Sequence, residues 1–205
     1  MNDLTCVLVT YNPNLEYFRG VLSKIFSNDV SIIVVDNGSE NSHEIQKVAS
    51  SVDVSFISLG KNVGIAKAQN LGIEKAFSEG ANYVWLSDQD TVYPETYAQS
   101  VSLLVEDLKK KKIRYGAIGP SFFELNRQRI EPFVRFAPYG KRFQPREGLN
   151  PVAHLIASGM IIPKNAFYAV GAKREDFFID WVDLEWCWRA NAKGYPVFGV
   201  GDLVI

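Results

Sequence analysis

Cysteine is scarce in this chain, which has only two cysteines among 205 residues. Cys6 and Cys187 stand far apart, neither belongs to a C-x-x-C pair, and both have apolar neighbours. This scarcity excludes a disulfide-rich scaffold and is typical of proteins from a reducing compartment. We therefore expect Cys6 in a strand and Cys187 in a helix, both as small buried side chains.

An excess of charge of one sign is also lacking. The chain has 22 basic and 23 acidic residues, so its net charge is −1. No overall electrostatic field then selects nucleic acid or an anionic membrane as a partner. The one basic run, residues 109–112, is expected at the C-terminal end of a helix, where the helix dipole favours cations.

Long hydrophobic runs are absent as well. No stretch approaches the ~18 apolar residues that a membrane-spanning helix needs. The first residues, MNDLTCVLVTYN, lack the basic-then-apolar order of a signal peptide. The sequence predicts that this segment is soluble and cytoplasmic.

Short apolar runs are present, in contrast, and recur along the first half of the chain. They lie at residues 4–9, 31–35, 54–59, 83–86 and 115–118. Each run is continuous rather than alternating, which is typical of strands covered on both faces. With 47% hydrophobic residues, the chain can build one sizeable domain.

Helical patterns lie between these apolar runs. Apolar residues from Phe18 to Ile25 follow the spacing of one helix face. Asn41 and Glu44 fit a capping box, and Pro94 suits the first turn of a later helix. Strands alternating with helices predict an α/β fold with a mostly parallel, doubly wound sheet and helices on both faces.

Polar, turn-forming residues follow four of the predicted strands. They are Thr10-Tyr11-Asn12-Pro13, Asp36-Asn37-Gly38-Ser39, Lys61-Asn62-Val63-Gly64 and Asp88-Gln89-Asp90. Ligands of such sheets bind beyond the carboxyl ends of the strands. Turn chemistry explains part of this pattern, but it does not predict an acid after the second strand and two acids after the fourth.

The regular alternation stops after about residue 122. Residues 125–150 contain three prolines and interleave basic with aromatic residues, which predicts a long loop without secondary structure. Such loops are usually functional, so we expect this one to cover a substrate or face a partner. RNA is an alternative, but no recognition motif accompanies the loop. A strand at 154–162, two helices and a last strand at 196–205 are expected to follow.

Asp88 and Asp90 form an acidic pair one residue apart, directly after a hydrophobic strand. Two such carboxylates repel, and one tends to stay protonated unless a cation lies between them. Mg²⁺ or Mn²⁺ takes oxygen ligands and typically binds one or two carboxylates plus substrate phosphates. The alternative is a polar turn that caps the next helix through Asp90 or Thr91. The spacing alone leaves both open.

Six segments, taken in order, resemble a known family. They are VTYN-P, VVDNGS, N-V-G-I-A-x-A-x-N-x-G, the acidic pair after a strand, S-G-M, and F-I-D-x-V-D-x-E-W-C-x-R. The set is similar to family 2 inverting glycosyltransferases of the GT-A fold, above all to bacterial rhamnosyltransferases of cell-surface polysaccharide synthesis. The resemblance runs from about Leu4 to Tyr195. It implies one GT-A domain with a nucleotide-sugar-binding half, residues 1–120, an acceptor and catalytic half, residues 121–205, and a missing C-terminal part.

The resemblance also implies a donor site at the strand ends. Asp36 matches the acid that accepts a hydrogen bond from the imide N–H of uracil or thymine, a donor that cytosine lacks. Gly64 matches a turn where the backbone approaches the nucleoside. The full set of donor-side positions at these ends is Thr10, Tyr11, Asn12, Asp36, Asn37, Asn62, Gly64 and Asp88. Ordinary turns are the alternative for the three asparagines.

The acidic pair matches the metal motif of this family. Asp90 would be the direct ligand of Mg²⁺ or Mn²⁺, and Asp88 would bind the ribose or the metal. The cation would offset the charge of the leaving diphosphate. The family often adds a later histidine ligand, but neither His43 nor His154 matches that position, so the metal shell is expected to be incomplete.

The segment before the last helix carries the implied chemistry. Asp183 matches the base that removes a proton from the acceptor hydroxyl during a single, inverting displacement. The alternative is that Asp180 and Asp183 cap the helix as its N-cap and N3 residues. Arg189 matches a basic residue near the donor phosphates. Ser158 and Gly159 match the acceptor side, where a plain tight turn is the alternative, and Trp186 is a candidate surface for a sugar ring.

The implied function is transfer of a sugar, rhamnose from a dTDP donor or another sugar from UDP, to a glycan or lipid-linked glycan. Any membrane contact would come from residues after Ile205, which would place a longer enzyme at the inner face of the cell membrane. A sugar nucleotidyltransferase is one alternative, but such enzymes have a Gly-rich loop with Arg and Lys where this chain has Thr10-Tyr11-Asn12-Pro13. A non-catalytic nucleotide-sugar-binding module is another, and the retained acids argue against it.

Overall fold

The structure is a computed structural model that describes residues 3–26, 30–52, 54–136 and 140–205. Among these residues, no helix has the length and hydrophobicity that crossing a membrane requires. The elements, in chain order, are β1 (Leu4–Thr10), α1 (Leu15–Phe26), β2 (Ser31–Asp36), α2 (Ser42–Ala49), β3 (Ser55–Ser58), α3 (Ile65–Ser78), β4 (Tyr83–Asp88), α4 (Tyr97–Lys110), β5 (Ala117–Ser121), β6 (Phe123–Glu124), β7 (Arg129–Ile130), β8 (Phe133–Arg135), β9 (Lys141–Phe143), β10 (Leu149–Val152), β11 (Ile161–Pro163), α5 (Lys164–Val170), α6 (Val182–Ala192) and β12 (Val197–Val204).

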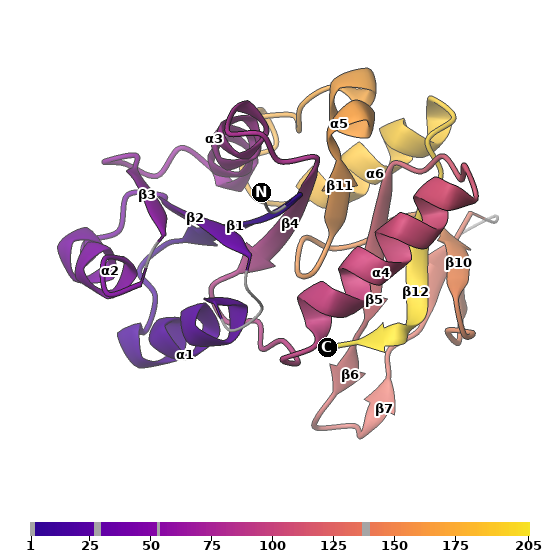
Figure 1. Cartoon of the computed structure of the whole chain (residues 1–205), viewed down its shortest axis with the longest axis horizontal. Coiled ribbons are helices and arrows are strands. Elements are labelled where there is room, and N and C mark those ends of the chain that lie inside the picture. Colours follow the sequence, from indigo (N-terminus) through magenta and orange to yellow (C-terminus); the bar gives the residue numbers. More distant parts are fainter. Residues whose placement is uncertain (1–2, 27–29, 53, 137–139) are drawn as a thin grey trace.

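One eight-stranded sheet runs through the molecule in the order β10-β12-β5-β11-β4-β1-β2-β3 (Figure 1). β1 pairs in parallel with β2 and β4, β2 with β3, and β12 with β5. The predicted mostly parallel sheet is therefore confirmed. Two strands depart from it, because β11 is antiparallel to β4 and β5, and β10 is antiparallel to β12.

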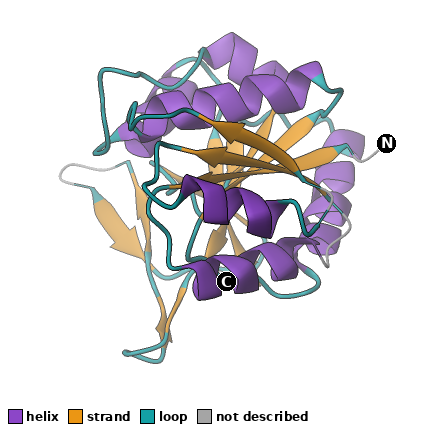
Figure 2. Cartoon of the chain, turned by 90° about the vertical axis from the view of Figure 1, so that its left-hand side faces the viewer, coloured by secondary structure: helices purple, strands orange, loops and turns teal. Residues whose placement is uncertain are grey.

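Helices cover both faces of this sheet (Figure 2). The buried side chains of α1, α2 and α4 pack in one hydrophobic core, and those of α3, α5 and α6 pack in the other. β1 contributes to both, because Val7 lies in one core while Cys6 and Leu8 lie in the other. This double burial explains the continuous apolar runs of the sequence. Cys6 and Cys187 are buried and free, as predicted, and belong to different cores.

The segment from residue 125 to 150 is not the structureless loop that the sequence predicts. β6 and β7 form one antiparallel pair, β8 and β9 form another, and β10 joins the main sheet. These strands are only two to four residues long, so their apolar pattern is too short to detect in the sequence. Residues 137–139, which belong to the predicted loop, lie outside the described part of the chain.

Three local expectations also need correction. The expected strand at 154–162 is reduced to β11, because residues 157–160 make a turn in which Met160 N donates to Ala157 O (2.8 Å). Asn41 precedes α2 without capping it, and its amide donates instead to Pro13 O (3.1 Å). α4 begins at Tyr97, so Pro94 lies before the helix rather than in its first turn.

Candidate active site

The carboxyl ends of β1, β2 and β4 meet at one edge of the sheet. The strand register places Thr10 beside Asp36 and Val9 beside Asp88. A cavity of about 320 Å³ opens there. Its lining includes six of the residues singled out in the sequence, namely Thr10, Tyr11, Asn37, Asn62, Asp88 and Asp90. The strand ends that the sequence marks as functional therefore share one cavity.

Asp36 is fully buried next to this cavity. Its Oδ1 accepts hydrogen bonds from Thr10 Oγ1 and Ser39 N, both at 3.3 Å. Its Oδ2 is also buried and has no hydrogen-bond partner among the described residues. Leaving a buried carboxylate oxygen without a partner is costly, and a ligand N–H would remove that cost.

The asparagines at the strand ends hold the loops together. Asn37 Oδ1 accepts from Val63 N (2.9 Å), and its amide donates to Asn62 Oδ1 (3.1 Å). Asn12 has a left-handed backbone (φ 45°), and its N–H donates to Ser39 Oγ (2.8 Å). The turn alternative thus describes what these side chains do within the fold. Asn37 and Asn62 also line the cavity, whereas Asn12 does not.

A contact within the protein requires glycine at position 64, and the approach of its backbone to the nucleoside stays a prediction. A Cβ there would lie 2.8 Å from Phe178 O and 2.9 Å from Phe178 Cδ2, and its φ is +86°. The next residue, Ile65, donates its N–H to Phe178 O (2.9 Å). This contact brings Phe178 and Ile179, both more than half exposed, into the cavity wall. Both residues belong to the F-I-D-x-V-D-x-E-W-C-x-R segment, but sequence analysis assigned them no role.

Gln89 connects the acidic pair to the loop after β1, a role that sequence analysis missed. Its Oε1 accepts from Tyr11 N (2.8 Å), and its Nε2 donates to Tyr11 O (3.3 Å). A glutamine between two acids looks like a spacer in the sequence. In the structure it fixes the distance between two walls of the cavity.

Asp88 and Asp90 present hard oxygen donors at the cavity. Burial raises the pKa of Asp88; the carboxylates of Asp183 and Asp90 add to the rise, and a hydrogen bond from Ser158 and the Lys173 cation oppose it. Within the described part of the chain, no group of three or more His, Cys, Asp or Glu residues could hold a metal ion. Two crowded carboxylates fit a divalent cation that shares its shell with substrate phosphates.

Asp183 lies close to Asp88 across one turn. Its Oδ2 accepts from Ala157 N (2.9 Å), while the hydroxyl of the next residue, Ser158, donates to Asp88 Oδ2. Consecutive residues of one turn therefore contact both acids, which places them at one site. The side chain of Asp183 is one-fifth exposed. The residue before α6 is Trp181, and it makes no side-chain cap, so neither Asp180 nor Asp183 caps the helix as the alternative proposed.

Lys173 is the partner of Asp183 that the sequence did not reveal. Its side chain is fully buried, and its Nζ donates to Asp183 Oδ1. The buried Asn70 of α3 holds its backbone, accepting from Lys173 N (3.0 Å) and donating to Lys173 O (2.9 Å). Asn70 is the last asparagine of the N-V-G-I-A-x-A-x-N-x-G segment, and a polar residue on the apolar face of a helix is the signal that could have pointed to it.

Two predicted site residues have structural roles instead. Trp186 is fully buried and donates from Nε1 to Gly171 O (2.8 Å), so its ring cannot stack on a sugar. Arg189 binds Glu185 and the carbonyl oxygens of Val170 and Ala172, with distances of 2.8–2.9 Å. These contacts hold the segment between α5 and α6 and occupy the guanidinium, so Arg189 is not placed to bind phosphates.

Gly159 also follows its structural alternative. Its φ is +79°, a Cβ would lie 2.7 Å from Tyr97 OH, and that hydroxyl donates to Gly159 O (2.6 Å).

Trp181 is the exposed tryptophan beside the site. It has a left-handed backbone (φ 68°), is 58% exposed, and its ring lies 5.6 Å from that of Trp188.

Comparison with known proteins identifies the family. A family model described as Glycosyl transferase family 2 matches residues 5–171. This chain belongs to glycosyl transferase family 2. The dTDP-rhamnosyl transferase RfbF of Shigella flexneri is 31% identical over 206 residues, which cover 98% of this chain and 68% of RfbF. The N-acetylglucosaminyl-diphospho-decaprenol L-rhamnosyltransferase of Mycobacterium tuberculosis is 27% identical over 222 residues, covering 94% of this chain and 71% of that protein.

Solved structures confirm the GT-A fold of this family 2 domain. TarS 1-349 of S. aureus in complex with UDP superposes with a TM-score of 0.72 at 14% identity, covering 98% of this chain and 58% of that chain. GalNAc-T7 with UDP, GalNAc and Mn²⁺ gives a TM-score of 0.69 at 14% identity, covering 97% and 42%. This chain therefore spans about half of the length of these two structures.

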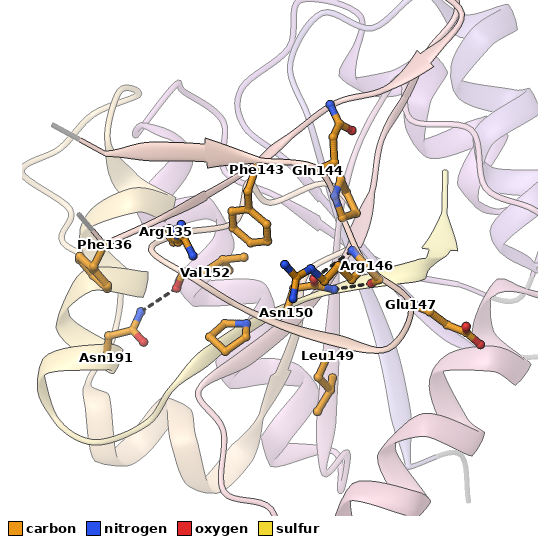
Figure 3. Close-up of a pocket in the computed structure, with 12 residues that line it drawn as sticks. Arg135, Phe136, Phe143, Gln144, Arg146, Glu147, Leu149, Asn150, Val152 and Asn191 are labelled. Carbon is orange, nitrogen blue, oxygen red and sulfur yellow. Dashed lines mark hydrogen bonds between the residues drawn. The ribbon is translucent and has the colours of Figure 1, made fainter. Parts of the chain in front are cut away.

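The family 2 domain has a second, larger cavity of about 780 Å³ (Figure 3). Its lining comes from β8, β9, β10 and the loop between β9 and β10, together with Asn191 of α6. Asn191 lies near the C-terminal end of α6, whereas Asp183 lies at its N-terminal end. The amides of Asn150 and Asn191 there donate to backbone carbonyls. It contains none of the predicted site residues, whereas six of them line the smaller cavity.

Proposed function

We propose that this domain transfers a sugar from a nucleoside diphosphate donor to a hydroxyl of a growing glycan, with inversion at the anomeric carbon. Rhamnose from dTDP-rhamnose is the donor that the relatives favour, since two of them carry rhamnosyltransferase names. The observation that carries the proposal is the shared turn, in which Ala157 binds Asp183 and Ser158 binds Asp88. This turn supports a common site for the proposed base and the acidic pair.

The nucleobase of the donor is proposed to lie against Asp36. Its unpartnered Oδ2 suits the imide N–H of thymine or uracil, and Thr10, Tyr11, Asn37 and Asn62 would surround the nucleoside. TarS, whose structure contains UDP, supports a uracil or thymine donor by fold likeness. Phe178 and Ile179 come from residues 121–205, so the proposed halves, 1–120 and 121–205, would both contribute to the donor site.

Asp90 and Asp88 are proposed to hold Mg²⁺ or Mn²⁺. The bound cation would offset the negative charge of the diphosphate. Two observations support this cation site: carboxylates crowd around Asp88, and the structure of GalNAc-T7 contains Mn²⁺. No further protein ligand is needed if phosphate oxygens complete the shell.

Asp183 is proposed as the base. The acceptor O–H bond breaks, its proton moves to the carboxylate, the acceptor oxygen bonds to the anomeric carbon, and the nucleoside diphosphate leaves from the opposite face.

Trp181, exposed two residues earlier, replaces Trp186 as the candidate surface for the acceptor sugar. A lipid-linked glycan would require the enzyme to reach the surface of the membrane that holds it.

The central test is Asp183→Asn, with Asp180→Asn as the matched control in the same segment. A general base contributes roughly 10²–10⁴-fold to the rate. We expect Asp183→Asn to lower turnover of dTDP-rhamnose by that factor with the donor dissociation constant unchanged, and Asp180→Asn to change neither. Release of dTDP in the presence of acceptor glycans measures turnover, and calorimetry measures donor binding.

Three outcomes would contradict the proposal. Full turnover in Asp183→Asn would remove the base assignment. Donor binding by the wild-type protein without turnover on any acceptor would favour the non-catalytic module. Pyrophosphate release from dTTP and a sugar 1-phosphate would revive the nucleotidyltransferase alternative.

A further inference from the structure

A fully buried lysine lies behind the proposed base. The Lys173 side chain has no solvent exposure, and the Asp183 carboxylate accepts from its ammonium group. Lysine is almost never fully buried unless it is paired, because removing its charge from water is costly. The fold therefore retains an unfavourable residue at this position, next to the carboxylate that the proposed reaction needs.

The position of Lys173 is fixed independently of its charge. Both backbone groups of Lys173 are hydrogen-bonded by the side-chain amide of Asn70, which is itself buried on α3. The same amide also donates to Glu175 Oε1 (3.3 Å). These bonds fix the backbone of Lys173, and burial confines the side chain that reaches Asp183.

Carboxylates from two elements interact with this ammonium group. Asp183 on α6 accepts its hydrogen bond, and Asp88 on β4 interacts with its charge. Lys173 thus supplies positive charge behind the site, where acids from different elements converge. Asp183 nevertheless remains one-fifth exposed, so it is reachable from outside.

We propose that Lys173 is a positioning residue for the transfer reaction. Its ammonium group fixes Oδ1 of Asp183 while Ala157 N fixes Oδ2, which holds the carboxylate in one orientation. An ionised carboxylate has about four lone-pair sites. Two are occupied here, and the others are free to accept the proton of the acceptor hydroxyl. The inference rests on the proposed role of Asp183 as the base.

A purely structural role for Lys173 makes a different prediction. Lys173 and Asp183 stand at the two ends of the segment that carries Phe178 and Ile179, so their ion pair could simply close this segment. These two residues line the donor cavity. Loss of such a closure would weaken donor binding, whereas loss of base positioning would lower turnover at unchanged donor affinity.

The test is Lys173→Met, with Lys164→Met as the matched control. Lys164 lies outside the site, and its ammonium group donates to Phe77 O (2.8 Å). We expect Lys173→Met to lower the turnover of dTDP-rhamnose about 10- to 100-fold, on the scale of losing an oriented base, with the donor dissociation constant unchanged. Lys164→Met should leave both unchanged.

A double variant gives the second readout. If Lys173 acts through Asp183, adding Lys173→Met to Asp183→Asn should lower turnover no further, because coupled residues are not additive. Multiplied losses in the double variant would overturn the inference. So would full turnover in Lys173→Met, or weaker donor binding at unchanged turnover.

Failure of this inference can be separated from failure of the proposed function. Full turnover in Asp183→Asn removes both, whereas loss in Asp183→Asn with full turnover in Lys173→Met removes only the role of Lys173. Should Lys173→Met not fold, Asn70→Ala tests the same idea, because it frees the backbone of Lys173 and keeps both charges. Reduced turnover with unchanged donor affinity would support the inference, and unchanged turnover would overturn it.

Discussion

Two carboxylates of the site differ in how their oxygens are used. Both oxygens of Asp183 have a partner within the protein, Lys173 for one and Ala157 for the other. Asp36 has partners for Oδ1 alone, and its buried Oδ2 has none among the described residues. A carboxylate that has a hydrogen-bond partner for only one of its oxygens is suited to recognise a ligand. For this reason we assign recognition of the nucleobase to Asp36.

Asp36→Asn should therefore weaken binding of UDP and remove selectivity for its base. A hydrogen bond to a charged group contributes about 1.5–3 kcal/mol, which corresponds to roughly a 10- to 150-fold change in affinity. CDP lacks the imide N–H, so its affinity should change little. Calorimetric titration of both nucleotides measures the difference. An equal loss for UDP and CDP would indicate that Asp36 only supports the loop.

At this scale, sequence reasoning found acids more reliably than their partners. Asp36, Asp88 and Asp90 are recognisable because each follows an apolar strand. Lys173 is not, because it stands beside Arg174 in a charged stretch, and nothing in the spacing shows which of the two is buried. Burial of a charged side chain depends on tertiary packing, here on Asn70 more than 100 positions earlier.

Among the elements, the segment before α6 and the start of α3 depend on each other. Ile65 N donates to Phe178 O, and Gly64 leaves no room for a side chain there. This contact holds one wall of the donor cavity against the other. Stability and donor affinity should therefore change together when the contact is broken.

Gly64→Ala tests this coupling, and Gly60→Ala is its matched control. Both glycines have a positive φ, but a Cβ at Gly60 meets nothing within 4 Å, whereas one at Gly64 meets Phe178. We expect Gly60→Ala to lower the free energy of unfolding by about 1–2 kcal/mol, the cost of a left-handed alanine. Gly64→Ala should lower it further and also weaken donor binding. Denaturant unfolding and calorimetry measure the two effects.

The opposite result for this pair is equally informative. If Gly64→Ala costs no more than Gly60→Ala and binds donor normally, the segment that carries Phe178 is not held by α3 in the way the structure indicates.

Element boundaries along the first half of the chain were predictable, because each strand is a continuous apolar run. The short strands between residues 123 and 143 were not, because a pattern needs more than three residues to show a period.

Over the whole molecule, the order of the sheet explains how distant segments reach one site. β4 lies between β1 and β11, so residues after β10 return to the middle of the sheet beside the acidic pair. The fold class follows from alternation and burial on both faces, and sequence reasoning predicted it. The antiparallel insertion of β11 pairs residues about 76 positions apart, such as Ile161 with Trp85, and no local pattern specifies such a pairing.

This arrangement predicts that donor and metal stabilise the molecule together. The donor cavity draws on β1, the loop after β2, β4, α3 and the segment before α6, so a bound donor would connect elements across the sheet. A ligand at about 100 times its dissociation constant stabilises by about 2.7 kcal/mol. For a domain of this size, 1 kcal/mol shifts the melting temperature by roughly 2–4 °C. We expect dTDP-rhamnose with Mn²⁺ to raise the melting temperature by about 5–10 °C.

Removing the metal should remove most of that rise. Asp88 and Asp90 are the proposed cation ligands, and without a cation their carboxylates repel the donor diphosphate. In EDTA, or in Asp90→Ala with Mn²⁺ present, dTDP-rhamnose should stabilise the protein much less than it does in the wild type with Mn²⁺. Glu95→Ala is a control, because Glu95 is an exposed acid paired with Lys24 outside the cavity. A full thermal shift in EDTA would show that the donor binds without a cation.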